Sequence, residues 1–357
     1  MIRVAIANDT LIALSALRQA IATNPAYELI WWAKDGCQAV ELCAKDTPDL
    51  MLMDLLMPGL DGVEATKQIM AHSPCAILIV TGSVRNNTSK IFEAMGHGAL
   101  DVVSTPVFGV SVADPSVPGA SVVKLPVSDA AKPLLEKMAT VTAFIGKSIR
   151  RQKTKKVMPR SRGAIAHLPH LIVIGASTGG PKALAQILQG LPVSLPAAVV
   201  IIQHIDEQFA SGLVSWLNAQ SNLPVRLAVE GAQIRPGQVY VAAGGQHLVM
   251  GRDRALHYIQ SGAQGDHPLP YRPSVDVFFN SVAQHWPHRG QAALLTGMGR
   301  DGAVGLGTLR SAAWQTIAES EESCIVYGMP RAAVESAAAC QVLPVNAISQ
   351  ALLEGLA

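Results

Sequence analysis

The chain has 357 residues, of which 49% are hydrophobic and 4% aromatic, and its formal net charge is +2. This length predicts two domains of about 150 residues each, and the composition predicts cores built from Ala, Val, Leu and Ile. The small net charge gives no argument for nucleic-acid binding, and the lack of an apolar run of about 18 residues argues against membrane insertion.

Short apolar runs alternate with helical patterns in the first third of the chain, which opens as a strand rather than as a signal peptide. Buried strands are predicted at residues 4–7, 29–33, 50–53, 77–81 and 101–103. Between the first two, apolar residues recur along one helical face, at Leu11, Leu14, Leu17 and Ile21. The alternation predicts a five-stranded, doubly wound parallel sheet, a flavodoxin-like domain over residues 1–125.

Two carboxylates follow strands that should be neighbours in this sheet. Asp9 ends the first strand and Asp54 the third, and in a doubly wound sheet the carboxyl ends of these strands meet. Two carboxylates there can hold Mg²⁺, which prefers oxygen ligands and neutralises charge on a transferring phosphoryl group. Thr81, at the end of the fourth strand, offers a hydroxyl to a phosphoryl oxygen. The alternative is that the two acids only cap helices.

The motif "DLLMPGLDG" begins at Asp54, and with Asp9 and Thr81 it resembles a response-regulator receiver domain. The resemblance implies that Asp54 accepts phosphate from a histidine kinase. It also implies that Mg²⁺ is held by Asp9, Asp54 and the carbonyl group of Leu56.

Three positions depart from the receiver pattern. Asn8 stands where the family has an acid, Thr105 where it has a lysine, and Val102 where it has an aromatic switch residue. The first change predicts weaker metal binding, and the second removes the cation that meets the phosphoryl group in the family. Together the changes leave two options, weakened control by this domain or control by a modified switch.

Residues 126–167 are predicted to be a helix and a basic linker. A Gly/Pro/Val/Ser-rich loop covers residues 107–126, and a helix over residues 129–150 has its apolar face at Leu134, Leu135, Met138, Val141 and Ile145. That helix is interpreted as the last one of the first domain. The basic stretch 147–162 is interpreted as a solvated tether, because no aromatic residues interleave its charges as stacking on bases requires; contact with nucleic acid or acidic lipid is the alternative.

The five cysteines are scattered and show no metal-ligand spacing. We interpret them as reduced thiols, which are typical of a cytoplasmic protein.

Residues 168–357 are predicted to form a mainly parallel α/β domain with an added β-hairpin. Near-continuous apolar runs at residues 171–176, 197–204 and 291–299 predict central strands. Period-two alternation over residues 238–260 predicts a hairpin beside the sheet. Helices are predicted at residues 274–286, 302–313 and 331–339.

The stretch "LIVIGASTGGPKALAQIL" joins a predicted strand to a predicted helix through a Gly-rich turn. It is not a phosphate loop, because Pro181 stands where that motif has lysine, and it is not a dinucleotide fingerprint, because Ser177 stands at the second glycine. The pattern G-x-S-x-G over residues 175–179 fits a nucleophile elbow. A serine that merely caps the helix is the alternative.

A nucleophilic serine needs a base, and the base needs an orienting acid. His204 and Asp301 each follow a predicted buried strand. If these strands run parallel to residues 171–176, both groups gather with Ser177 at one sheet edge. The order Ser, His, Asp differs from that of α/β-hydrolases.

The motifs "IGASTGGP", "QHI", "RPSVDVFF", "LTGMGRDG" and "GMPRAAV" resemble the catalytic domain of the chemotaxis protein-glutamate methylesterase family. The resemblance implies that Ser177 is the nucleophile, His204 the general base and acid, and Asp301 the orienting carboxylate. It also implies an oxyanion hole with the backbone N–H of Met298 and a site lined by Thr178. Arg272 is predicted to position groups of the acceptor helix, with a structural ion pair as an equal alternative.

The resemblance implies hydrolysis of glutamate methyl esters on chemoreceptor helices without a cofactor in the esterase reaction, and glutamine deamidation in some members. It implies a receiver that covers the cleft until a histidine kinase phosphorylates it, and a monomer is expected. A variant from a non-flagellar chemosensory array fits the same motifs. The alternatives are a non-enzymatic adaptor that binds receptor and kinase, and a nucleotide hydrolase, against which Pro181 argues.

Overall fold

The computed structural model describes residues 1–82, 88–108, 127–142, 168–260 and 271–356. The chain divides into two compact units, Met1–Lys147 and Ser148–Ala357. Most of the predicted loop over residues 107–126, the basic stretch 147–162 and the end of the predicted helix over residues 129–150 lie outside the described residues. The domain boundaries at residues 125 and 167 stay a prediction.

The first unit is built on a five-stranded sheet in the order β2-β1-β3-β4-β5, and all its strand pairs are parallel. Its strands are β1 (Ile2–Ala7), β2 (Tyr27–Ala33), β3 (Leu50–Met53), β4 (Ala76–Thr81) and β5 (Asp101–Ser104). The sheet therefore confirms the predicted flavodoxin-like fold, in which β1 and β3 are neighbours. Its central strands are apolar runs because helices cover both faces of a parallel sheet.

Among the described residues, five helices accompany this sheet: α1 (Leu11–Ala22), α2 (Gly36–Lys45), α3 (Gly62–His72), α4 (Thr88–His97) and α5 (Val127–Thr142). The buried face of α1 starts one turn later than predicted, because Leu11 is 76% exposed whereas Leu14, Leu17 and Ile21 are buried. Leu134 and Met138 of α5 are buried in the core of the first unit. This helix therefore packs with the first unit, within the residues that the structure describes.

The second unit is built on a seven-stranded sheet in the order β15-β14-β13-β6-β7-β10-β8, and every pair in it is parallel. Its strands are β6 (His170–Ala176), β7 (Ala197–Gln203), β8 (Val225–Leu227), β10 (Val239–Val241), β13 (Gln291–Leu294), β14 (Gln315–Glu319) and β15 (Gln341–Leu343). The three strands predicted to be central, β13, β6 and β7, lie side by side in its middle. Their carboxyl ends therefore meet at one edge of the sheet.

The predicted hairpin is present, but it is shorter than the period-two pattern. Strands β11 (His247–Met250) and β12 (Ala255–Ile259) pair antiparallel, and β9 (Ala232–Gln233) joins them. The segment Val239–Val241 was expected in the hairpin and instead lies in the parallel sheet between β7 and β8. The reason is that all three of its residues are buried, so it does not alternate between core and solvent.

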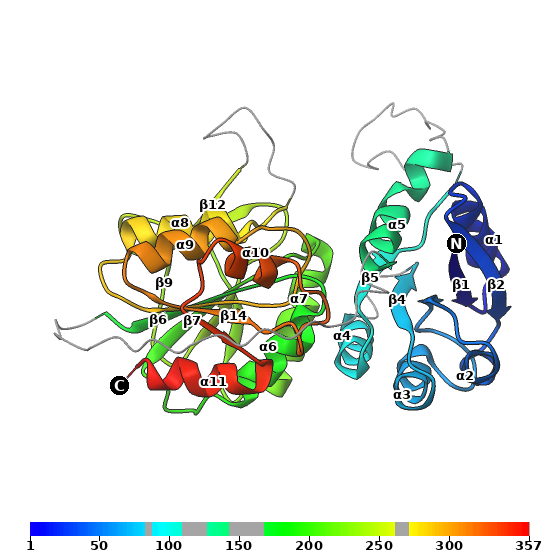
Figure 1. Cartoon of the computed structure of the whole chain (residues 1–357), viewed down its shortest axis with the longest axis horizontal. Coiled ribbons are helices and arrows are strands. Elements are labelled where there is room, and N and C mark those ends of the chain that lie inside the picture. The colour runs from blue at the N-terminus through cyan, green and yellow to red at the C-terminus, as the bar shows by residue number, and fades with distance from the viewer. Residues whose placement is uncertain (83–87, 109–126, 143–167, 261–270, 357) are drawn as a thin grey trace. The chain divides into compact units, whose positions relative to one another are not determined.

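Helices cover both faces of this sheet (Figure 1). They are α6 (Gly180–Gln189), α7 (Glu207–Gln220), α8 (Val275–His285), α9 (Ala303–Ser311), α10 (Met329–Glu335) and α11 (Val345–Glu354). Figure 1 shows α8, α9 and α10 on one side of the strands and α6 with α11 on the other. Helix α10 begins two residues before the predicted segment 331–339 and ends four residues before its end.

Candidate active site

Strand register brings Ser177 and His204 together. Ala176 of β6 pairs with Gln203 of β7, so Ser177 and His204 are the next residues on two neighbouring parallel strands. The backbone N–H of His204 donates to the Ala176 carbonyl at 3.0 Å, and the N–H of Ser177 donates to the Thr296 carbonyl, beyond β13, at 3.0 Å. The predicted gathering of these strand ends is therefore present.

The turn that carries Ser177 requires its glycines. Gly179 is the N-cap of α6 and has a φ of +78°, in the left-handed region that favours glycine. A Cβ on Gly180 would lie 2.1 Å from the side-chain oxygen of Gln203. Because Gly179 holds the cap position and makes no side-chain cap bond, Ser177 is not the helix cap that the sequence left open.

The hydroxyl of Ser177 has no recorded hydrogen-bond partner in the described parts of the chain, whereas its carbonyl is held twice. Gly180 donates to that carbonyl from its backbone at 2.7 Å, and the Gln203 side-chain amide donates to it at 2.9 Å. Ser177 is only 8% exposed. The backbone of Ser177 is therefore fixed, while its hydroxyl oxygen is left available.

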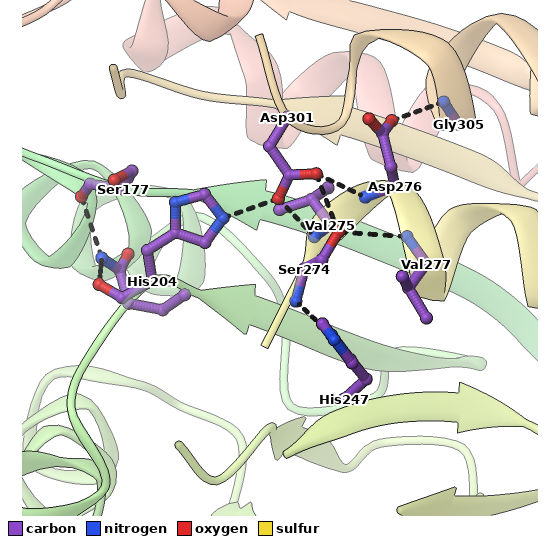
Figure 2. Close-up of polar contacts among 10 residues, drawn as sticks. Ser177, His204, His247, Ser274, Val275, Asp276, Val277, Asp301 and Gly305 are labelled. Atoms are coloured by element: carbon purple, nitrogen blue, oxygen red, sulfur yellow. Dashed lines mark hydrogen bonds and ion pairs between the residues drawn. The ribbon is translucent and has the colours of Figure 1, made fainter. Parts of the chain in front are cut away.

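His204 and Asp301 form a close pair. Nε2 of His204 lies 2.7 Å from Oδ2 of Asp301, and the two side chains are 8% and 9% exposed. Figure 2 shows the imidazole between Ser177 and Asp301. Since a carboxylate accepts from Nε2, the proton is assigned to Nε2 and the lone pair to Nδ1. Nδ1 is buried and has no hydrogen-bond partner within the described ranges.

No hydrogen bond between the Ser177 hydroxyl and His204 is among the contacts of the described residues. Catalytic hydrogen bonds of this kind are often long in enzymes without substrate and tighten in the complex. The arrangement therefore leaves one base nitrogen and one hydroxyl on adjacent strand ends.

The start of α8 holds Asp301 through three further donors. The Ser274 hydroxyl donates to Oδ1 at 2.8 Å, the Val275 N–H to Oδ2 at 2.7 Å and the Asp276 N–H to Oδ1 at 3.1 Å. Burial works to raise the pKa of Asp301, but hydrogen bonds, first from His204 and then from α8, lower it below its usual value. Asp301 is therefore a fixed carboxylate.

A second acid lies behind Asp301. Burial, and then the neighbouring charge of Asp301, raise the pKa of Asp276 to about 6, and the N–H of Gly305 donates to its Oδ1 at 2.6 Å. Sequence reasoning did not identify Ser274 or Asp276 as part of this site. In the sequence, Ser274 stands immediately before an apolar helical pattern, and a serine in that position is typical of a helix N-cap.

The turn after β13 carries the predicted oxyanion donor. The N–H of Met298 has no recorded acceptor in the described segments, while the adjacent Gly297 donates to Val326 at 3.0 Å and accepts from Met329 at 2.8 Å. Thr296 fixes the same turn, because its hydroxyl donates to the carbonyl of Thr178 at 2.9 Å. Met298 and Thr178 therefore both lie in segments tied to the Ser177 turn.

The buried carboxyl group of Glu319 also holds this turn. Glu319 is 1% exposed and accepts from the Thr296 N–H at 2.8 Å and from the Ser323 hydroxyl at 2.9 Å. Burial raises its pKa. Sequence reasoning missed Glu319, because this residue lies at the end of an apolar run and belongs to no recognised motif.

Tyr271 and Arg272 border the site from the segment before α8. The Tyr271 ring stacks on the imidazole of His204 with centroids 4.3 Å apart and planes at 5°. Arg272 is exposed and lines a cavity of about 420 Å³ with Glu207, Gln246, Tyr258 and Gln260. Over the described ranges no ion pair of Arg272 is recorded, so no contact supports the structural ion pair that the sequence left open.

The acidic residues of the first unit also meet at a sheet edge. The Asn8 side-chain amide donates to Oδ2 of Asp54 at 3.0 Å, and the Leu56 N–H lies 3.3 Å from Oδ1. Burial raises the pKa of Asp54, and the nearby charge of Asp9 adds to this. Thr81 is buried at the end of β4.

Neither acid caps a helix. The N-caps of α1 and α3 are Thr10 and Asp61, so the capping alternative for Asp9 and Asp54 is wrong. Thr105 donates from its backbone to the Thr81 carbonyl at 3.0 Å, and it brings no charge to the position where the receiver pattern has lysine. Val102 is buried in β5.

In the described segments no cluster of three or more His, Cys, Asp or Glu side chains could hold a metal ion. No helix in those segments has both the length and the hydropathy needed to cross a membrane.

Comparisons with known proteins match both units. Residues 172–352 match the family described as CheB methylesterase, and residues 4–109 match the response regulator receiver domain. The "Protein-glutamate methylesterase/protein-glutamine glutaminase 1" of Bordetella avium is 48% identical over 350 residues, which cover 98% of this chain and 96% of that protein. A protein of Pseudomonas aeruginosa with the same name but numbered 3 is 46% identical over 352 residues, 99% of each chain. The solved CheB methylesterase catalytic domain of Thermotoga maritima is 34% identical, with a TM-score of 0.49 over 53% of this chain and 99% of that one.

Proposed function

The chain belongs to the CheB methylesterase family, with a response regulator receiver domain in front, and from this premise we propose that Ser177, His204 and Asp301 hydrolyse glutamate methyl esters. The substrate is the γ-methyl ester of a glutamate on a chemoreceptor helix. The observation that carries the proposal is the buried His204–Asp301 pair, whose remaining ring nitrogen faces no partner within the described ranges.

In the first half of the reaction, the Ser177 oxygen attacks the ester carbonyl carbon while Nδ1 of His204 takes the hydroxyl proton. The tetrahedral oxyanion accepts hydrogen bonds, including one from the N–H of Met298. When the intermediate collapses, the C–O bond to the methoxy group breaks, and His204 returns the proton to the departing methanol.

In the second half, water attacks the acyl-serine and His204 takes one proton from it. Collapse releases the glutamate carboxyl group and restores the serine hydroxyl with the proton from His204. Asp301 stays ionised throughout, because its four hydrogen bonds favour the carboxylate, and it stabilises the imidazolium that forms in both halves.

The same steps deamidate glutamine if an amide replaces the ester, with ammonia as the leaving group in place of methanol. The printed names of the relatives join both activities, "protein-glutamate methylesterase/protein-glutamine glutaminase". A helical protein substrate would require an open cleft rather than a deep pocket.

Methanol release from methylated receptor fragments tests the esterase assignment. The Ser177→Ala variant should lose at least about 10³-fold in kcat, and Ser215→Ala, an exposed serine on α7, should match the wild type. Equal rates for wild type and Ser177→Ala would overturn the nucleophile assignment.

The receiver residues fit a magnesium ion with a reduced ligand set. Asp9, the second oxygen of Asp54 and the Leu56 carbonyl would hold it, while the Asn8 amide donates to the other Asp54 oxygen. When bound, the ion neutralises charge on the incoming phosphoryl group. Asp54 then receives phosphate from a histidine kinase, and phosphorylation raises esterase activity. We further propose that the protein acts as a monomer in the cytoplasm and binds no nucleic acid.

Phosphorylation is tested with a phosphohistidine donor or with beryllofluoride, which imitates an aspartyl phosphate. Esterase activity should rise when beryllofluoride and Mg²⁺ are added together, and Asp54→Asn should abolish the rise. Activity that ignores beryllofluoride would mean that the receiver no longer controls the esterase.

A further inference from the structure

One face of the catalytic imidazole is covered by an aromatic ring. Tyr271 lies parallel to His204, with an interplanar angle of 5° and centroids 4.3 Å apart. Neither the serine mechanism nor the acid that orients His204 requires this contact. Its close and parallel geometry calls for a role of its own.

The contact fixes a degree of freedom that Asp301 leaves open. The hydrogen bond from Nε2 to Asp301 restrains one edge of the ring, but the plane of the imidazole can still rock about the Cβ–Cγ bond within the range that this hydrogen bond tolerates. A parallel ring 4.3 Å away opposes this rocking. Rocking of the plane would turn the lone pair of Nδ1 out of line with the Ser177 hydroxyl.

The Tyr271 side chain also lies against the turn that carries Asp301. A Cβ on Gly299 would lie 3.1 Å from the Tyr271 hydroxyl oxygen, so that oxygen fills the space next to Gly299. Gly299 follows Met298, whose N–H is assigned to the oxyanion hole. One aromatic side chain therefore touches the base on one side and the oxyanion turn on the other.

The same short segment also holds the acid. Ser274, Val275 and Asp276 donate to Asp301, and Tyr271 stands three residues before Ser274. Residues 271–276 thus fix the base and its acid from one stretch of backbone.

We propose that Tyr271 is a positioning residue of the esterase reaction, which holds the plane of His204 so that Nδ1 meets the Ser177 hydroxyl. The aromatic face also favours the imidazolium formed during acyl transfer, because a ring face attracts a cation. The proposal rests on the proposed esterase function. Of the two contacts of Tyr271, the positioning role requires the stacked ring and not the hydroxyl group beside Gly299.

The full-length Tyr271→Phe and Tyr271→Leu variants separate these parts. Aromatic pairs contribute about 0.5–1.5 kcal/mol beyond area burial, so Tyr271→Leu should lower kcat for methanol release about three- to tenfold with KM unchanged. Tyr271→Phe keeps the stacked ring and should stay within about twofold of wild type. Thermal unfolding midpoints of both variants, compared with wild type, report on folding.

Proton NMR of His204 gives a second readout that does not depend on turnover. A ring stacked on the imidazole shifts its C–H resonances upfield, so Tyr271→Leu should move them downfield while Tyr271→Phe leaves them in place. A Leu variant with wild-type kcat would overturn the proposal, and so would a Phe variant as slow as Leu, or a change confined to KM.

Different results would overturn the proposed esterase function and the proposed role of Tyr271. If the wild-type protein releases no methanol, the proposed function is wrong, and the NMR comparison still decides whether Tyr271 holds the His204 ring. If methanol release depends on Ser177 but not on the residue at 271, only the positioning role is wrong.

Discussion

The sites of the two units are formed in the same way, but the carboxylate in the second unit accepts more hydrogen bonds than the one in the first. In both, polar side chains follow buried parallel strands and meet at the carboxyl edge of the sheet, as Asp54 does in the first and Ser177 in the second. Around Asp301 four donors converge. Around Asp54 the described residues contribute one side-chain amide, from Asn8, and backbone contacts from Leu56 and Leu55.

This difference separates a site built for one fixed geometry from a site that has to change state. The proposed general base catalysis needs Nδ1 of His204 at a fixed distance from the attacking oxygen, and small displacements are costly in rate. A phosphoacceptor has to accept and lose a phosphoryl group together with a metal ion. We therefore expect substitutions around Asp301 to lower kcat for methanol release steeply, and substitutions around Asp54 to have moderate effects on metal binding.

The steepest loss is expected for Asp301→Asn. An amide at this position cannot stabilise the imidazolium and favours the wrong tautomer of His204, so kcat for methanol release should fall roughly 10³- to 10⁴-fold. Asp253→Asn is the matched control, since Asp253 also contacts a histidine, His257, but at an exposed position. A kcat within tenfold of wild type would contradict the role given to Asp301.

Ser274→Ala should have an intermediate effect. It removes one hydrogen bond to the buried carboxylate and leaves the two backbone donors of α8, so kcat should fall about tenfold, or about 1.4 kcal/mol. Ser311→Ala, whose hydroxyl donates within α9 at an exposed position, serves as the control. An unchanged kcat would show that the backbone donors suffice.

On the receiver side, Asn8→Asp should strengthen Mg²⁺ binding by about fivefold, because it adds a carboxylate next to Asp54 and removes the amide donor. Titration of Mg²⁺ against the tryptophan fluorescence or the proton NMR spectrum of the full chain measures this. Binding that stays the same or weakens would mean that Asn8 is not at the metal position.

The smallest effect expected is a slope of stability with pH that depends on Asp276. Its pKa is raised from 3.8 to about 6 in the folded chain, so the folded state holds this proton more tightly than the unfolded state does. The contribution of Asp276 to the free energy of unfolding should therefore be fully present below pH 3.8 and be lost as the pH rises through about 6, by on the order of 1–3 kcal/mol. Denaturant titrations of Asp276→Asn should lack this part of the slope.

Much of the fold followed from the sequence, because buried parallel strands are continuous apolar runs. Residues 50–53 were predicted as a strand with the bounds that the structure has. The segment Val239–Val241 was misassigned because three buried residues flanked by turns carry no sign of which sheet they join. Leu11 was placed on a buried face because helical periodicity does not show where the neighbouring core begins.

The site was predictable to the extent that strand ends position it. Ser177 and His204 follow paired residues of adjacent strands, so their proximity follows from the topology. The contacts of Tyr271 and Ser274 depend on how the segment before α8 crosses the sheet edge, and no local pattern in the sequence encodes that path. Nor does the sequence show which ring nitrogen of His204 faces Asp301, because both tautomers fit the same motif.

The pairing of Ala176 with Gln203 also means that neither β6 nor β7 can change in length at this end without separating Ser177 from His204. Adding one residue at the end of β7 would move His204 about 3.3 Å along the strand relative to Ser177 and turn its side chain to the other face. One residue added after α6, between Gln189 and Gly190, would leave this alignment intact. Methanol release by the two insertion variants would compare them directly, and the larger loss is expected for the insertion at the end of β7.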